Sequence, residues 1–193
     1  DPQSPTNQLI KLHQDATKLY THILMNTEMG QPALDYLHKR GLTDQTISDY
    51  GLGFAPSKQL LKPFFETRKI DYQTLRHSGL FIENSDGELR DRFVDRIMYP
   101  IRNQSGQEIA FSGRMLNQTP DQPKYLNSPE TELFNKRKVL FNFDLARGAV
   151  RKQGDLILFE GFMDVMSAHQ SGVDNGVASV SYTHLTLPTI CSV

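Results

Sequence analysis

The sequence predicts an α+β fold in which helices and a β-hairpin region are followed by the start of a parallel α/β unit. Apolar residues recur at helical spacing through most of the first 80 residues. Apolar segments separated by turn residues follow between positions 81 and 114. Near the end, apolar runs at 156–159 and 176–180 enclose a helical segment, which is the order expected of two parallel strands joined by a helix.

Three helices are expected before residue 52. Apolar side chains between residues 7 and 26 recur three and four positions apart, as on one face of a long amphipathic helix. A second, short helix has Pro32 in its first turn, where proline is tolerated, and a stop at Gly41. Thr43 is expected to cap a third helix that ends near Gly51, because its hydroxyl oxygen can accept from a free helix N–H.

Two shorter helices and a β-hairpin follow. Residues 57–69 and 71–77 are expected to be helical, and Pro63 is expected to kink or break the first of them because proline lacks an N–H group. The strands 96–102 and 108–114 are separated by an Asn-Gln-Ser-Gly turn, which is typical of a hairpin.

The last third of the chain contains a loop, a basic connector and a βαβ unit. Residues 118–129 are rich in Pro, Asn, Gln and Asp and are expected to form a loop. Residues 134–152 are a basic connector that includes some helix. A strand that ends at Glu160, a helix over 162–171 and a strand over 176–180 complete the prediction.

Length and composition fit a globular chain. The 193 residues, 38% of them apolar, suffice for one large domain or two small ones. No apolar stretch approaches the roughly 20 residues that a bilayer requires, and no signal peptide is evident, so we expect no membrane partner and a cytoplasmic location. The only cysteine, Cys191, excludes a disulfide or thiolate zinc site within these residues. The start at Asp1, without a methionine, indicates a fragment.

Charge is distributed unevenly along the chain. The net charge is -1, but residues 88–152 hold 12 of the 21 Lys and Arg residues against 8 acids, and the flanks are acidic. From residue 153 onward Lys and Arg are missing while four acids remain, an arrangement suited to cation capture beside a basic groove. Ordinary solvated surface is the alternative interpretation of these counts.

Two carboxylates form the first candidate site. Glu160 follows an apolar strand and Asp164 stands in the first turn of the next helix. Ligands bind at the carboxyl ends of strands in open α/β sheets, and paired acids there can hold magnesium against phosphate oxygens. Alternatively, Glu160 only caps the helix. A glycine-rich phosphate loop, a histidine metal motif and a Ser–His–Asp arrangement are not found.

Two basic motifs form the second candidate site. Arg90, Arg92 and Arg96 alternate with acids and aromatics and are expected to share a face of an extended segment that binds phosphates and bases. A surface strand with Arg–Asp pairs is the equal alternative. Residues 124–131 combine a lysine, a tyrosine and amide or hydroxyl donors, although such a loop is more often a plain turn.

Taken together and in this order, these segments closely resemble the RNA-polymerase domain of bacterial replicative DNA primases, the DnaG family. The resemblance spans roughly residues 7–180. The segments that carry it are 36–42, 51–56, 91–101, 111–114, 124–131 with Lys136, and 160–164.

The resemblance implies an α+β N-terminal subdomain at 1–152, with a basic template groove, packed against the start of an α/β Toprim domain with a partial parallel sheet at 153–180. It implies DNA-directed RNA synthesis by metal-dependent nucleotidyl transfer. In this family Mg²⁺ or Mn²⁺ would bind at the Toprim site. The residues that match family positions are Glu160 and Asp164 for catalysis and metal, Arg40, Lys124, Tyr125, Asn127 and Lys136 for nucleotide or phosphate, and Arg92, Arg96 and Arg114 for template DNA.

The resemblance also implies partners. Single-stranded DNA template and ribonucleoside triphosphates would bind this bacterial, cytoplasmic and monomeric core. Zinc belongs to the family's N-terminal domain and the replicative helicase binds its C-terminal domain, and neither domain is expected within these residues.

The sequence departs from the family pattern from about Ser181. The family continues to a strand ending in Asp-x-Asp, its main metal ligands, whereas residues 181–193 look foreign or misread. We therefore expect this chain, as printed, to synthesise little or no primer. Two alternatives remain open: a Toprim nuclease or topoisomerase-like enzyme, and a non-catalytic module that binds single-stranded nucleic acid.

Overall fold

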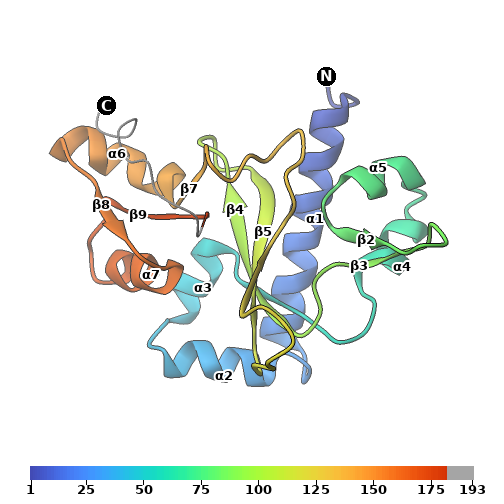
Figure 1. Cartoon of the computed structure of the whole chain (residues 1–193). Coiled ribbons are helices and arrows are strands. Elements are labelled where there is room, and N and C mark those ends of the chain that lie inside the picture. The colour runs from blue at the N-terminus through green and yellow to red at the C-terminus, as the bar shows by residue number, and fades with distance from the viewer. Residues whose placement is uncertain (182–193) are drawn as a thin grey trace.

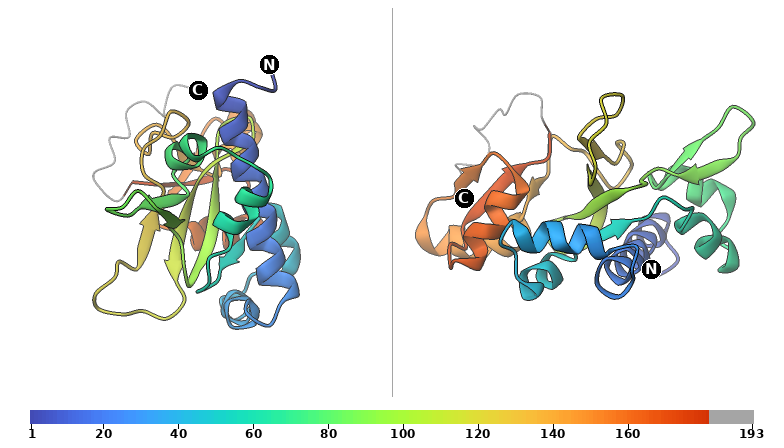
Figure 2. Two further views of the ribbon diagram at one scale, coloured as in Figure 1. Left: turned by 90° about the vertical axis from the view of Figure 1, so that its right-hand side faces the viewer. Right: turned by 90° about the horizontal axis from the view of Figure 1, so that it is seen from below.

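The computed structural model describes residues 1–181. The expectations for the 181–193 tail therefore lie outside the described residues from position 182 onward. A central antiparallel sheet lies between a second, smaller α/β unit on one side and a pair of short helices with a β-hairpin on the other (Figure 1). Viewed from below, the three parts lie in a row (Figure 2). The chain is therefore a mixed α+β protein, as the sequence predicts.

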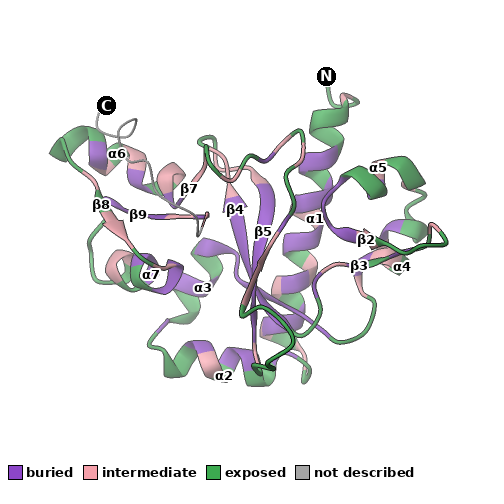
Figure 3. Ribbon diagram, viewed as in Figure 1, coloured by how far each residue is buried: buried purple, intermediate pink, exposed green. Residues whose placement is uncertain are grey.

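Helix α1 (Pro5–Asn26) packs along the central sheet. Ser4 caps it by accepting from the N–H of Asn7, and the predicted apolar face is buried (Figure 3). The helix approaches strand β1 (Gly53–Ala55) so closely that a Cβ placed on Gly53 would lie 2.4 Å from Cβ of Tyr20. Thr21 Oγ1 donates to the carbonyl of Leu52 over 3.0 Å. Glycine at position 53 is therefore a packing requirement.

Helices α2 (Gln31–Lys39) and α3 (Asp44–Tyr50) confirm the predicted order. Pro32 lies in the first turn of α2. Thr43 caps α3 by accepting from the N–H of Thr46 over 3.2 Å, and Gly51 ends it in a left-handed conformation with φ 63°.

The central sheet has the order β1-β4-β5-β6, with antiparallel neighbours. The predicted hairpin is confirmed, and its turn is closed by the Asn103 side chain, which accepts from the N–H groups of Ser105 and Gln107. The short strand β6 lies within the segment expected to be a loop. The strands are β1 (Gly53–Ala55), β4 (Arg96–Arg102), β5 (Glu108–Met115) and β6 (Tyr125–Asn127).

A peripheral part contains two short helices and a second hairpin. The expectation that Pro63 kinks or breaks a helix over 57–69 is wrong, because α4 starts only at Leu61 and places this proline in its first turn. The Asp91 carboxylate, from β3, accepts from the N–H groups of Leu60, Leu61 and Lys62 and so supplies the cap. The elements are α4 (Leu61–Thr67), α5 (Tyr72–His77), β2 (Phe81–Glu83) and β3 (Leu89–Asp91).

The smaller α/β unit has a mixed sheet of order β7-β9-β8. Strands β8 and β9 are parallel, as predicted, and β7 pairs antiparallel with β9. The domain boundary expected at residue 152 falls inside α6, and β7 joins this sheet from before that boundary. The elements are β7 (Leu140–Phe141), α6 (Phe143–Gln153), β8 (Ile157–Phe159), α7 (Phe162–Gln170) and β9 (Gly176–Ser179).

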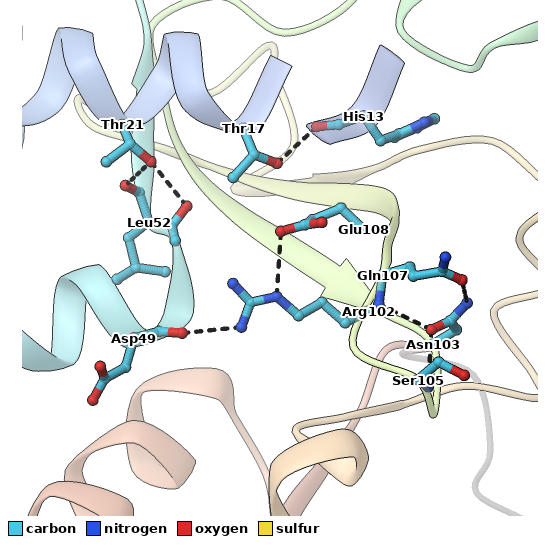
Figure 4. A network of polar contacts seen from close by, with 11 residues as sticks. His13, Thr17, Thr21, Asp49, Leu52, Arg102, Asn103, Ser105, Gln107 and Glu108 are labelled. Atoms are coloured by element: carbon cyan, nitrogen blue, oxygen red, sulfur yellow. Dashed lines mark hydrogen bonds and ion pairs between the residues drawn. The ribbon is translucent and has the colours of Figure 1, made fainter. Parts of the chain in front are cut away.

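Arg102 ties the end of β4 to α3. Its Nη1 donates to the carbonyl of Asp49 over 3.0 Å, and its Nε lies 3.6 Å from Oε1 of Glu108 in the partner strand (Figure 4). The hairpin and the helix are thereby fixed at the junction with the smaller unit.

His13 is a buried, neutral histidine on α1. Its ring stacks 5.8 Å from that of Phe111, and the residue is 1% exposed. Its Nδ1 lies 2.8 Å from the Leu9 carbonyl and so is the protonated nitrogen, whereas Nε2 has no partner among residues 1–181. Burial lowers the pKa of His13 to about 4, and the bond to Leu9 offsets part of that effect.

We expect His13 to make the fold less stable as the pH falls from 6.5 towards 4. In this window the unfolded chain binds a proton at His13 and the folded chain does not, so the free energy of unfolding falls by about 1.4 kcal/mol per pH unit. Urea unfolding at pH 7, 6 and 5 should show a smaller fall for His13→Phe than for the natural chain. Equal pH dependence in the two chains would contradict a buried neutral histidine.

Candidate active site

The two predicted carboxylates lie at the carboxyl edge of the second sheet. Strand β8 ends at Phe159, opposite Ala178 of the parallel strand β9, so the chain leaves both strands at one edge. Glu160 follows directly, and Asp164 lies in the first turn of α7; both are exposed. Among residues 1–181, no group of three or more Asp, Glu, His or Cys side chains is arranged to hold a metal ion. At this edge the described chain therefore offers a cation two solvent-facing carboxylates.

Asn127 connects the central sheet to that same edge. Its Nδ2 donates to the carbonyl of Val180, directly after β9, over 2.9 Å. Arg92 donates to the Asn127 carbonyl from Nε and Nη2, at 3.2 and 2.8 Å. The end of β6 is thus held between Arg92 and the smaller unit.

Arg96 is buried beneath β6 and is 3% exposed. Its Nη1 donates to the carbonyls of Gly113 and Lys124 at 3.0 and 3.2 Å, and its Nη2 donates to that of Pro123 at 2.9 Å. Burial lowers the pKa of Arg96, and the charge of Arg92 adds to this shift. The guanidinium therefore fixes the backbone that presents Lys124 and Tyr125.

The three arginines of the second motif do not share one extended face, as the sequence suggested. Strand β3 ends at residue 91, and Asp95 has a left-handed φ of 54°, which turns the chain before β4. As a result Arg90 is exposed, Arg92 is half-buried and Arg96 is buried.

An arginine–tyrosine cluster, formed by Tyr36, Arg40, Arg114 and Tyr125, joins α2 to β5 and β6. Arg40 Nη1 donates to the Tyr36 hydroxyl over 2.8 Å, and the Arg114 guanidinium lies 4.6 Å from the centre of the Tyr36 ring. Arg114 pairs with Tyr125 across β5 and β6. Lys124 extends the cluster, with Nζ 5.9 Å from the centre of the Tyr125 ring.

The cluster is a region of uncompensated positive charge. Within residues 1–181 its arginines and Lys124 form no ion pair with a carboxylate, since the six ion pairs found there involve other cations. Arginine forks and aromatic faces are suited to phosphates and bases.

Tyr99, which the sequence reading gave no role, lies between the cluster and α7. It is fully buried, and its ring centre lies 5.6 Å from that of Phe162, the first residue of α7. Burial raises the pKa of the Tyr99 hydroxyl, which has no hydrogen-bond partner within the described residues. Only its position in a strand next to basic motifs could have drawn attention to it.

Lys136 lies in a separate turn. Its backbone N–H donates to Oε1 of Glu130 over 3.2 Å, and the turn is anchored by Phe134, which is 1% exposed. Its half-buried side chain makes no hydrogen bond or ion pair with the other residues in 1–181. The structure thus groups seven of the ten predicted site residues around β6, namely Arg40, Arg92, Arg96, Arg114, Lys124, Tyr125 and Asn127. It places Glu160 and Asp164 at the neighbouring edge of the second sheet and leaves Lys136 without a contact to either group.

Comparisons with known proteins bear on this arrangement. Residues 20–147 match the family described as the DNA primase catalytic core, N-terminal domain. The DNA primase of Enterococcus faecalis is 50% identical over 192 residues, which cover 95% of this chain and 30% of that protein. The RNA polymerase domain of Mycobacterium tuberculosis primase DnaG superimposes with a TM-score of 0.87 at 29% identity, over 95% of this chain and 60% of that one. A DnaG primase catalytic domain bound to single-stranded DNA gives 0.79 at 35% identity, over 92% and 55% of the two chains.

We expect Arg96→Lys to loosen the strand that carries Lys124 and Tyr125. Lysine has no planar fork with which to reach three carbonyl groups, and the loss should destabilise the fold by about 2 kcal/mol. Hydrogen exchange read by mass spectrometry should show faster exchange of amides in 125–127. The same change at exposed Arg90 is the control and should leave these amides protected, so equal protection in both variants would contradict the role assigned to Arg96.

Proposed function

Because the chain belongs to the bacterial DNA primase family, with residues 20–147 matching the N-terminal domain of the catalytic core, we propose that it binds template and nucleotide for RNA primer synthesis on single-stranded DNA. One observation carries the proposal: the arginine–tyrosine cluster and the carboxylate edge are joined by the Asn127–Val180 bond. The chain spans 30% of the length of its Enterococcus relative, so activity of the whole protein is part of the proposal.

In this proposal the cations of the site bind phosphates. Arg40, Lys124 and Lys136 hold the triphosphate or template phosphates, with Tyr125 as a stacking surface for the base. Exposure of Arg40 and Lys124 supports this assignment. Asn127 contributes mainly by holding β6 to the smaller unit, because its amide nitrogen already donates to Val180.

The remaining arginines act on template. Arg92 donates to the Asn127 carbonyl, and Arg114 lies opposite Tyr125 in β5. Half-buried Arg92 provides positive charge for the DNA backbone, and Arg114, which is 8% exposed and donates to the Met115 carbonyl, adds to that charge from beneath the surface. Arg96 supports the template face indirectly, because its donors are engaged by backbone carbonyls.

Glu160 and Asp164 would hold a divalent cation, Mg²⁺ or Mn²⁺. The two exposed carboxylates at this edge fit such an ion, because Mg²⁺ keeps several waters and is commonly bound by one or two protein carboxylates together with substrate phosphates. Bound there, the ion would neutralise charge on the phosphates during nucleotidyl transfer. The carboxylates would orient that ion at the helix N-terminus, and the arginine–tyrosine cluster would orient the triphosphate beside it.

Partners follow from the family. We infer that single-stranded DNA and ribonucleoside triphosphates bind this chain, because a structural relative at 35% identity is bound to single-stranded DNA. Binding of a replicative helicase, a zinc site and residence in the bacterial cytoplasm are proposed for the whole protein. None of the helices in residues 1–181 combines the length and apolar character needed to cross a membrane.

A non-catalytic binding module is the second candidate. It is favoured by one observation, namely that no cluster of three metal-ligating side chains occurs within residues 1–181. The membership of the primase family removes the reason to prefer a nuclease or topoisomerase.

We expect Lys124→Ala to weaken binding of a fluorescein-labelled single-stranded DNA by about three- to tenfold and to reduce the slope of log affinity against log salt by about 1. Lys18→Ala, on the exposed side of α1, is the matched control and should bind like the natural chain. Fluorescence anisotropy at several salt concentrations measures both. Equal affinities and slopes for the two variants would contradict a phosphate contact at Lys124.

We expect Glu160→Gln to abolish the magnesium dependence of nucleotide binding. Isothermal titration of ATP into the natural chain should show tighter binding with Mg²⁺ than with EDTA, and the variant should lose that difference. If the natural chain binds DNA but magnesium has no effect on nucleotide in either protein, the non-catalytic module is the better description.

A further inference from the structure

Helix α7 connects the carboxylate edge to the turn between α2 and α3. Its first turn carries Asp164, and its last residue is Gln170. Nε2 of Gln170 donates to the carbonyl of Gly41 over 2.8 Å, and its Oε1 accepts from the N–H of Thr43 over 2.9 Å. One side-chain amide thus binds two backbone groups of the other structural unit.

The clamped turn is part of the end of α2 that carries Arg40. The N–H of Leu42 donates to the carbonyl of Leu37 over 3.1 Å, and the N–H of Arg40 donates to that of Tyr36 over 3.0 Å. Leu42 is buried, with 2% exposure, so the turn is anchored to the helix that precedes it. A shift of the turn would therefore move Arg40 and its bond to Tyr36.

The other end of α7 is held by packing. Phe162, Met163, Val165 and Met166 are all buried in the core cluster that also contains Leu37. The helix has 9 residues, a length of about 13 Å. It is a rigid spacer of fixed length between the carboxylates at its start and the clamp at its end.

We propose that Gln170 is a positioning residue for triphosphate binding: its amide clamp on Gly41 and Thr43 holds Arg40 at a fixed place relative to Glu160 and Asp164. The inference rests on the proposed function, in which Arg40 and the two carboxylates bind one magnesium nucleotide. The clamp sets the spacing between Arg40 and those carboxylates.

The chemistry of the clamp requires an amide. A glutamine side chain can donate to one carbonyl and accept from one N–H at the same time. Glutamate at position 170 keeps the acceptor for Thr43 but places a negative charge against the Gly41 carbonyl. Gln153, the last residue of α6, is exposed and makes no side-chain hydrogen bond within residues 1–181, so it provides a matched control.

The first measurement is local. Backbone amide exchange should be faster at Thr43 in Gln170→Ala than in the natural chain or Gln153→Ala, while Ile47, whose N–H donates to the Thr43 carbonyl inside α3, keeps its protection. Unchanged exchange at Thr43 would overturn the proposal, because the clamp would then not hold the turn.

The second measurement is the affinity for MgATP by isothermal titration. Gln170→Ala should weaken binding by about three- to tenfold, the effect of one or two net hydrogen bonds, and Gln170→Glu should weaken it at least as much, because its carboxylate repels the Gly41 carbonyl. Gln153→Ala should bind like the natural chain. A thermal unfolding midpoint within a few degrees of that of the natural chain shows that a variant folds. If Gln170→Ala does not fold, the affinity is measured with Gln170→Glu instead.

A double-mutant cycle separates positioning from a general loss of stability. If Gln170 acts through Arg40, the losses caused by Gln170→Ala and Arg40→Ala should be clearly less than additive, whereas Gln153→Ala and Arg40→Ala should add. Additive losses at Gln170 and Arg40, or unchanged MgATP affinity in Gln170→Ala, overturn the clamp and leave the proposed function standing. Failure of the natural chain to bind MgATP at all removes the nucleotide-binding part of that function and this inference with it.

Discussion

The structure depends on the burial of both faces of the central sheet. Alternate side chains of β4 enter different cores: Ile97, Tyr99 and Ile101 pack with α2, α3, α7 and the last turn of α1, whereas Met98 packs with residues 9–20 of α1. Strand β5 divides in the same way, because Phe111 joins the α1 side and Ala110 the other. A sheet covered on both faces has little free surface except at its rim. Binding groups are accordingly found where the strands end and at the outer strand β6.

Burial on both faces also explains why polar side chains are buried beneath the outer strand β6. The short strand β6 has only three residues paired with β5 and lies at the outer edge of the sheet. Arg96 replaces the missing partners by donating to carbonyls before and beside this strand, and Asn127 fastens its end to Val180. Two buried or half-buried polar side chains thus stabilise a strand that directly follows the exposed Lys124.

The sequence predicted those elements whose signals are local. The helical spacing of α1, the Thr43 cap and the strand–turn–helix around Glu160 all depend on residues close together in the chain, and all three were found. Strand β6 was not predicted, because its sequence is typical of a loop and its partners lie in β5 and at Arg96.

The same distinction applies to the candidate site. The arginines at 90, 92 and 96 were placed on one face because a left-handed turn at Asp95 has no reliable signal in the sequence. The carboxylates could be found from a strand that ends in an acid. The contact of Arg114 with the Tyr36 ring could not, because it depends on how α2 meets β5, and only the family resemblance pointed to those positions.

The junction between the units has a practical consequence for protein engineering. Because β7 pairs with β9 and α6 packs on that strand, a recombinant piece that begins at residue 153 would lack an edge strand and a covering helix of its own sheet. A separately expressed C-terminal unit has to begin before Leu140.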